Sequence, residues 1–256
     1  MPVLRLQPNR DNKGVLLIHG GFDSFKEELI SWAYYFIQQG YKTIIFDGPG
    51  QGEALIKYHL PLTYAWEQPS KSILEYFGLE EVTILGVSMG GWLCFRVAAF
   101  EPRIKRVIAS SVVFDYLQIP PSFIAMIAKM LLKYPKILDS LTYLQMKVSS
   151  QERWAINNLM HITKKDTPTD AAKELLKLNE ENLHSEQVFQ EVLILTGKED
   201  HFIPLKMHHK QVAALKNANS VTERIFTRAE NAQNHCQVGN LGLALDVMSS
   251  WLESKR

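Results

Sequence analysis

The sequence predicts an α/β fold with a mostly parallel, doubly wound sheet, and two observations support this prediction. Short apolar segments with the length of buried strands alternate with longer segments of helical periodicity. The apolar segments lack the polar alternation of a half-exposed sheet, which is typical of parallel strands covered by helices on both faces. A long helical stretch after the fourth predicted strand interrupts this alternation and indicates an insertion into the sheet domain.

The predicted strands share a largely apolar character, and most of them are bounded by glycine, charged residues or other turn-forming residues. They are 15–18, 43–46, 82–85, 107–110, 192–195 and 221–226. Helices are predicted where apolar residues recur at helical spacing, and two of them end at a glycine, which tolerates the left-handed backbone that terminates a helix. They are 27–39, 64–77, 89–100, 204–216 and 238–253.

The insertion occupies residues 115–187, where helical periodicity is present and no strand is predicted. Its expected helices are 122–133, 149–161 and 169–182. We therefore divide the chain into an α/β core of residues 1–114 and 188–256 and a helical cap or lid of residues 115–187. A cap in this position is expected to cover one end of the sheet.

Composition restricts the classes of function. The 256 residues are 46% hydrophobic, enough for one large core, and 28 Lys and Arg balance 27 Asp and Glu, so no nucleic-acid surface is expected. Two cysteines, Cys94 and Cys236, do not make a disulfide framework. The N-terminus lacks the pattern of a signal peptide, and no apolar run is long enough for a membrane span. The sequence thus predicts a cytoplasmic protein.

No cofactor or metal is expected. The glycine-rich segment Asp47–Glu53 lacks the Gly-Lys-Ser/Thr ending of a phosphate-binding loop, so we interpret its carboxylates as anchors of the loop. His201, His208 and His209 are interpreted as surface residues of a loop and a helix. His208 and His209 are adjacent, and adjacent helical residues point to different sides, which makes a poor metal pair.

The strongest chemical signal is the pentapeptide Gly86-Val87-Ser88-Met89-Gly90. It follows a predicted strand and opens a predicted helix, the setting in which a sharp turn exposes a nucleophilic serine. Because the helix begins at Met89, its unpaired N–H groups face the serine. We therefore expect Ser88 to be the nucleophile and the Met89 N–H to be one donor to a developing oxyanion.

A serine nucleophile needs a base, and the base needs an orienting acid. Asp200 follows the fifth predicted strand and His235 follows the sixth. The carboxyl ends of the strands collect catalytic groups in open α/β sheets, so we expect His235 to take the proton of Ser88 and Asp200 to orient His235. Two alternative acids are Glu199, which adjoins Asp200, and Asp115, which follows the fourth strand.

The turn His19-Gly20-Gly21-Phe22 follows the first predicted strand. Turns in this position supply the second oxyanion-hole N–H, so either Gly21 or Phe22 is the donor, and the sequence leaves that choice open. His19 is interpreted as a structural residue that hydrogen-bonds the turn.

Together these residues resemble the α/β-hydrolase superfamily over 13–113 and 190–254. Three segments are similar to one branch, which contains dihydroxy-pseudo-oxynicotine hydrolase, fungal polyketide-shortening hydrolases and acylaminoacyl-peptidase-like esterases. These segments are GGFDSFKEE (20–28), FDGPGQGE (46–53) and NHCQVGN (234–240).

The resemblance implies an α/β-hydrolase fold and a triad of Ser88, Asp200 and His235. It also implies a carbonyl substrate. A carboxylic ester is the preferred class, and an amide or a C–C bond beside a ketone are the alternatives. Members of the branch carry a helical region and leading strands before the first core strand. Here that strand starts near Val15, so we expect both to be missing.

The predicted cap is rich in apolar residues at helical spacing. We expect a small-molecule substrate with an apolar acyl or aromatic part. Its predicted contacts are Phe22, Trp154, Met126 and Met130. An alternative is that the helix 122–133 touches a membrane surface. Two functional alternatives also remain: a non-catalytic ligand-binding protein of the same fold, and an acyltransferase or perhydrolase in which another acceptor replaces water.

Overall fold

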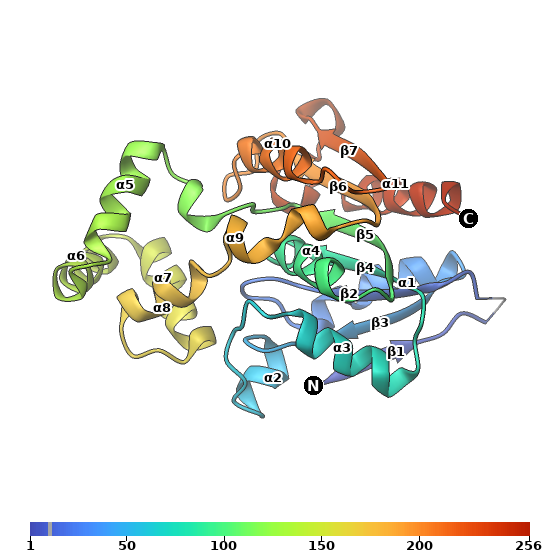
Figure 1. Ribbon diagram of the computed structural model, residues 1–256, viewed down its shortest axis with the longest axis horizontal. Helices are drawn as coiled ribbons and strands as arrows, with labels where there is room; N and C mark the ends of the chain where they lie inside the picture. Colours follow the sequence, from blue (N-terminus) through green and yellow to red (C-terminus); the bar gives the residue numbers. More distant parts are fainter. Residues whose placement is uncertain (10–11) are drawn as a thin grey trace.

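A seven-stranded sheet forms the centre of the computed structural model, which describes residues 1–9 and 12–256 (Figure 1). The strand order is β1-β3-β2-β4-β5-β6-β7. Six of the strands are parallel: β2 (Val15–His19), β3 (Lys42–Phe46), β4 (Val82–Val87), β5 (Ile104–Ser110), β6 (Glu191–Gly197) and β7 (Ser220–Phe226). All six were predicted from the sequence, and the α/β fold class with a mostly parallel sheet is confirmed.

The strand β1 (Val3–Leu6) was not predicted. It pairs antiparallel with β3 at the edge of the sheet, with Val3 opposite Phe46. The expectation that the leading strands would be missing is therefore wrong for this strand. Its signal is weak because it is short and because Arg5, in its middle, is exposed to solvent.

Alternate residues of the strands face two separate hydrophobic cores. Ile84 and Val107 belong to one core, and their neighbours Leu85 and Ile108 belong to the other. The first core packs against α3 (Glu67–Phe77), α4 (Gly90–Phe100) and α10 (Leu205–Ala214). The second core packs against α1 (Ile30–Gln38) and α11 (Leu241–Ser254). Burial on both faces explains why these strands are apolar without alternation.

Residues 115–187, called the insert below, contain helices and no strand among the described residues. The helices are α5 (Ser122–Leu131), α6 (Pro135–Val148), α7 (Ser150–Thr163), α8 (Pro168–Leu175) and α9 (Glu180–Leu183). Figure 1 shows α5 to α8, coloured green to yellow, gathered beyond one side of the sheet. Helix α6 was not predicted, and α8 and α9 were predicted as one helix, although Asn179 caps a new helix by accepting from the Asn182 N–H.

Shorter helices complete the chain. They are η1 (Lys26–Leu29), α2 (Gly52–Ile56), η2 (Tyr116–Gln118), η3 (Ser185–Gln187), η4 (Arg228–Glu230) and η5 (His235–Gln237). Throughout residues 1–9 and 12–256, every helix is too short or too polar to cross a bilayer.

The junction between β4 and α4 requires a glycine at position 86. A Cβ atom there would lie 2.0 Å from the Gly90 carbonyl oxygen. We expect Gly86→Ala to lower the free energy of unfolding by about 1–3 kcal/mol, because the strand and the helix must move apart. Urea denaturation measures this loss.

The matched control is Gly242→Ala in α11. No atom lies within 4 Å of the position that its Cβ would occupy. Alanine also favours a helix over glycine by up to about 1 kcal/mol, so this variant should be neutral or more stable. Equal unfolding free energies for the two variants would contradict the steric argument.

Candidate active site

Ser88 occupies the turn between β4 and α4 and has a left-handed backbone, with φ of 61°. This conformation costs a non-glycine residue about 1–3 kcal/mol and persists only where surrounding contacts hold it. Here the Ser88 N–H donates to the Ser110 carbonyl at 2.9 Å, and the Gly91 N–H donates to the Ser88 carbonyl at 2.9 Å. The strained turn therefore holds Ser88 in a defined position at the carboxyl end of β4.

A continuous line of hydrogen bonds joins Ser88, His235 and Asp200. His235 Nε2 lies 2.8 Å from Ser88 Oγ, and His235 Nδ1 lies 2.7 Å from Asp200 Oδ2. A carboxylate only accepts, so Nδ1 carries a proton, and in the neutral ring Nε2 is left to accept from the serine hydroxyl. The structure thus brings together all three residues that the sequence predicted as nucleophile, base and acid.

Asp200 is buried and strongly held. Its Oδ1 accepts from the backbone N–H groups of Phe202 and Ile203, each at 2.9 Å, and its Oδ2 also accepts from Ser111 Oγ at 3.1 Å. Burial raises the pKa of Asp200, but the hydrogen bond and charge of His235 and the two backbone N–H groups outweigh it, so the net pKa is lowered. Asp200 is consequently a charged acceptor at neutral pH.

The two alternative acids are engaged elsewhere. Glu199 pairs with Arg228 at 2.6 Å on the surface. Asp115 caps η2, where its carboxylate accepts from the Leu117 N–H at 2.8 Å and from Gln118 at 3.1 Å. Both carboxylates therefore have local structural partners, whereas Asp200 is the one in contact with His235.

The environment of His235 favours its protonated form. Burial lowers the pKa of His235, but Asp200 and Cys236 outweigh burial and raise it from the usual 6.5 to about 10. A general base works only when neutral, so we expect kcat/KM to rise with pH with a midpoint above 6.5. A pH–rate profile with an ester substrate measures this midpoint, and a midpoint at or below 6.5 would contradict the expectation.

The same pKa shift has a consequence for stability. A histidine with a raised pKa in the folded state stabilises the fold fully below its unfolded pKa of about 6.5. That contribution is then lost as the pH rises through the folded pKa, about 10 for His235. Activity and this part of the stability are therefore expected to change in opposite directions as the pH rises.

Two turns meet at Ser88, its own turn with the Met89 N–H and the turn of Gly21 and Phe22. Gly21 lies directly over the serine turn, because a Cβ on Gly21 would be 2.8 Å from Met89 N and 3.1 Å from Ser88 Cβ. The Gly21 N–H itself donates to Ser24 Oγ at 2.9 Å. Within the described chain, the N–H groups of Phe22 and Met89 have no acceptor. Of the two donors that the sequence left open, Phe22 is the one that remains available.

Gln51 supports this turn and was missed by the sequence analysis. Its Nε2 donates to the carbonyl oxygens of Gly20 and Gly21 at 2.8 and 3.1 Å. His19 is fully buried beneath the turn, and burial lowers its pKa to about 4 against the opposing hydrogen bond to the Gly20 carbonyl. His19 is therefore neutral and structural, as the sequence indicated.

The loop that contains Gln51 is tied down by its carboxylates. Asp47 accepts from the backbone N–H groups of Lys26 and Glu53 at 2.7 and 3.0 Å. The Lys26 ammonium lies 3.3 Å from Asp47 and 2.9 Å from Glu53. These contacts confirm the interpretation of both carboxylates as loop anchors.

The residues predicted to bind substrate lie in two places. Phe22 meets Trp154 of α7 edge-on, with ring centroids 6.2 Å apart, and Trp154 is 48% exposed. Met126 and Met130 lie on α5 and are both more than half exposed. The structure brings Phe22 and Trp154 together, and a substrate contact of the two methionines stays a prediction.

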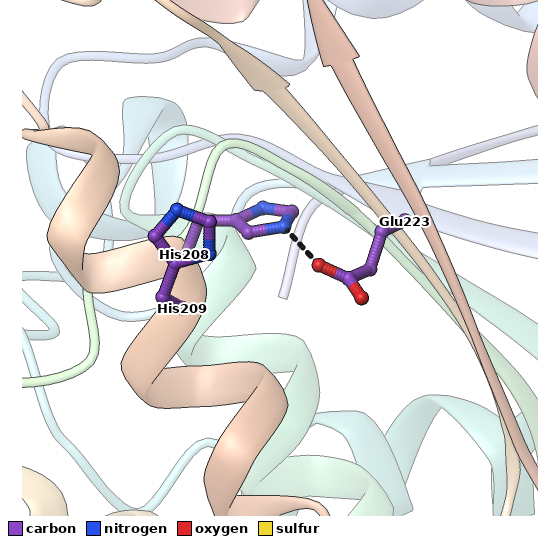
Figure 2. Close-up of side chains that lie close together, drawn as sticks. All are labelled: His208, His209 and Glu223. Carbon is purple, nitrogen blue, oxygen red and sulfur yellow. Dashed lines mark hydrogen bonds and ion pairs between the residues drawn. The ribbon is translucent and has the colours of Figure 1, made fainter.

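The expectation that His208 is a surface residue is wrong. Its ring is buried between α10 and the sheet, where Nδ1 lies 2.9 Å from Thr196 Oγ1 and Nε2 lies 2.8 Å from Glu223 (Figure 2). Glu223 only accepts, so Nε2 carries the proton, and burial keeps the ring neutral by lowering its pKa against the opposing effect of Glu223.

The possible ligand atoms of His208, His209 and Glu223 lie within 4.8 Å of one another. Both ring nitrogens of His208 are already hydrogen-bonded, so it would have to exchange the Nε2 proton for a metal ion. These two hydrogen bonds give His208 a structural role, because they link α10 to the strands β6 and β7.

Comparison with known proteins places this chain in a family. The family model described as "Serine aminopeptidase, S33" matches residues 10–228. Hydrolase LUC6 of Fusarium sp. is 27% identical over 93% of this chain and 61% of its own length. The 20-hydroxy-prefusarin hydrolase FUS2 of Gibberella moniliformis is 27% identical over 94% of this chain and 61% of its own. The chain thus spans less than two thirds of these curated relatives.

Solved structures support the same fold. 2,6-Dihydroxy-pseudo-oxynicotine hydrolase superimposes with a TM-score of 0.71 at 22% identity, covering 98% of this chain and 63% of that one. The α/β hydrolase GrgF from Penicillium sp. sh18 superimposes with a TM-score of 0.69 at 14% identity, covering 99% of each chain. With a family model that matches most of its length, the protein belongs to the S33 serine aminopeptidase family of α/β hydrolases.

Proposed function

We propose that the protein is a serine hydrolase that cleaves a carbonyl substrate through an acyl-enzyme on Ser88. The observation that supports this most directly is the hydrogen-bonded line from Ser88 Oγ through His235 to Asp200. A carboxylic ester is the first substrate class to test, and an amide or a C–C bond beside a ketone would use the same groups. Water is the acyl acceptor in this proposal.

In the proposed reaction, Ser88 Oγ attacks the carbonyl carbon while its proton moves to His235 Nε2. The carbonyl oxygen becomes an oxyanion, which accepts from the N–H groups of Met89 and Phe22. His235 then gives its proton to the leaving group, and Asp200 stabilises the imidazolium in the meantime. Water attacks the acyl-enzyme by the same route. Each oxyanion donor is typically worth about 2.7–4 kcal/mol of transition-state stabilisation.

Contacts between the insert and Phe22 support a cap at this site. We propose that residues 115–187 form the cap, and that residues 1–114 and 188–256 form the α/β core. Asn158 of α7 donates to the Phe22 carbonyl at 3.1 Å, so the insert contacts the core at the turn His19–Phe22, which we call the oxyanion turn. The half-exposed ring of Trp154 beside Phe22 supports a substrate with an apolar acyl or aromatic part.

The names of similar proteins are consistent with a small organic substrate. One curated relative is named as a hydrolase of 20-hydroxy-prefusarin, and one similar structure as a hydrolase of 2,6-dihydroxy-pseudo-oxynicotine. For this chain, a small molecule of that general kind is a proposal that rests on the apolar surroundings of Phe22.

Covalent labelling tests the proposed nucleophile. A fluorophosphonate probe should label the wild-type protein once, and peptide mapping should place the adduct on Ser88. Ser140→Ala, which changes an exposed serine on α6, should label like the wild type. Hydrolysis of p-nitrophenyl butyrate, compared with the matching anilide, distinguishes an ester from an amide preference. A folded wild type that takes no label, or a Ser88→Ala variant that labels equally, would overturn the proposal.

A further inference from the structure

We propose that Asn158, on helix α7 of the insert, is a positioning residue that holds the oxyanion turn in its productive geometry. Through this contact the insert would set the rate of acyl transfer at Ser88 as well as cover the site. The inference rests on the proposed function of Ser88 and of the N–H groups of Met89 and Phe22. It assigns a role in the reaction to a residue outside the predicted core.

One face of α7 holds Phe22 at two points. Asn158 Nδ2 donates to the Phe22 carbonyl oxygen at 3.1 Å. The Trp154 ring packs edge-on against the Phe22 ring, with centroids 6.2 Å apart and an interplanar angle of 69°. Trp154 and Asn158 are four residues apart in a helix, so they project from the same face. The backbone and the side chain of Phe22 are therefore both fixed by the insert.

The remaining supports of the turn come from the core. Gln51 holds the Gly20 and Gly21 carbonyl groups, and Ser24 accepts from the Gly21 N–H. Within the described chain, Asn158 is the one side chain that hydrogen-bonds the backbone of Phe22. The peptide that presents the Phe22 N–H is held on one side by Gln51, which donates to its Gly21 carbonyl. The other side of the Phe22 N–H is the Phe22 backbone itself, whose carbonyl belongs to the next peptide. Asn158 fixes that next peptide, so the orientation of the Phe22 N–H is restrained from both sides.

The helix α7 is fixed to the core independently of Asn158. The Leu62 N–H donates to the Ile162 carbonyl at 2.8 Å, and the side chains of Leu159 and Ile162 are buried in the first hydrophobic core. Removing the Asn158 amide should therefore leave α7 in place and release only the oxyanion turn. This separation makes a positioning role distinguishable from a structural one.

The neighbouring residue Asn157 offers a matched control. It lies on the same helix and is exposed, whereas Asn158 is partly buried. Asn157→Ala and Asn158→Ala make the same chemical change with the same effect on helix propensity. For p-nitrophenyl butyrate, we expect Asn158→Ala to lower kcat and kcat/KM by about 10-fold, within the range caused by a small misplacement of a reacting group, with KM nearly unchanged. Asn157→Ala should behave like the wild type.

The rate of fluorophosphonate labelling provides a second readout, because the phosphoryl oxygen uses the same donors as the oxyanion. It should fall in Asn158→Ala by a similar factor and stay constant in Asn157→Ala, and the two variants should have similar Tm values. Asn158→Asp cannot donate to the Phe22 carbonyl and should be impaired at least as much.

Equal kcat values for the two alanine variants would overturn the positioning role while leaving the proposed function intact, provided that the wild type labels at Ser88. A raised KM at constant kcat would also overturn it, because Asn158 would then act in binding. A wild type that does not label would instead show that the proposed function itself has failed.

Discussion

Replacing Ser88 with alanine is expected to lower kcat for an ester substrate by about 10⁶-fold, the loss typical of removing a serine nucleophile. The hydroxyl is the atom that attacks the carbonyl, and no acyl-enzyme can form without it. A residual rate above the uncatalysed reaction should persist, because the N–H groups of Met89 and Phe22 would still bind the oxyanion. Steady-state hydrolysis of p-nitrophenyl butyrate at high enzyme concentration measures the loss.

The fold of the Ser88→Ala variant should be unchanged. The left-handed backbone at this position has a similar conformational cost for serine and for alanine. The substitution removes the one hydrogen bond to His235 Nε2. We expect the free energy of unfolding to change by less than about 1.5 kcal/mol. If a folded Ser88→Ala protein kept more than a small fraction of wild-type activity, the nucleophile would lie elsewhere, and Cys236, beside the base, would be the first residue to examine.

Most of the parallel strands could be predicted because they are largely buried and apolar, whereas the edge strand β7 was recognised although it is partly exposed. Strand β1 has neither property, since it lies at the edge and presents Arg5 to solvent. Helix α6 was missed for a related reason. It has no buried residue and begins with Pro135 directly after Tyr134, so a proline interrupts the sequence where the helix starts.

The three central site residues could be predicted because each follows the carboxyl end of a parallel strand, and those ends meet at one edge of the sheet. The choice between Gly21 and Phe22 depends instead on whether the Ser24 hydroxyl occupies the Gly21 N–H, which sequence spacing does not reveal. Gln51 acts across loops that are distant in sequence.

The burial of His208 depends on partners from two different strands, Thr196 and Glu223. A histidine in the middle of a partly polar helix gives no sign of such partners in sequence. Contacts of this kind, formed between polar side chains of separate elements, are the part of the site that required the structure.

The replacement of Asp200 by asparagine is expected to lower kcat by about 10⁴-fold, and the surroundings of the side chain give the reason. Asp200 Oδ1 accepts from the N–H groups of Phe202 and Ile203, so the single oxygen of an asparagine would take that position. Its NH₂ group would then face His235 and donate to Nδ1. His235 would carry its proton on Nε2 and could no longer accept one from Ser88.

Glu199→Gln is the matched control, because it neutralises the adjacent carboxylate, whose partner is Arg228 on the surface. It should keep activity within about twofold of the wild type, since an exposed surface ion pair contributes little. Asp115→Asn tests the other alternative acid. Activity near the wild-type level in Asp200→Asn, with a large loss in Asp115→Asn, would transfer the orienting role to Asp115.

The pH dependence of the unfolding free energy tests the role of the Asp200 carboxylate. The pKa of Asp200 is lowered in the folded state, so its charge stabilises the fold above the unfolded pKa, about 3.9, and that contribution is lost as the pH falls through the folded value. Asparagine does not titrate, so the difference in unfolding free energy between wild type and Asp200→Asn should shrink on acidification below about pH 4. A difference independent of pH would mean that the ionised carboxylate is not what holds His235.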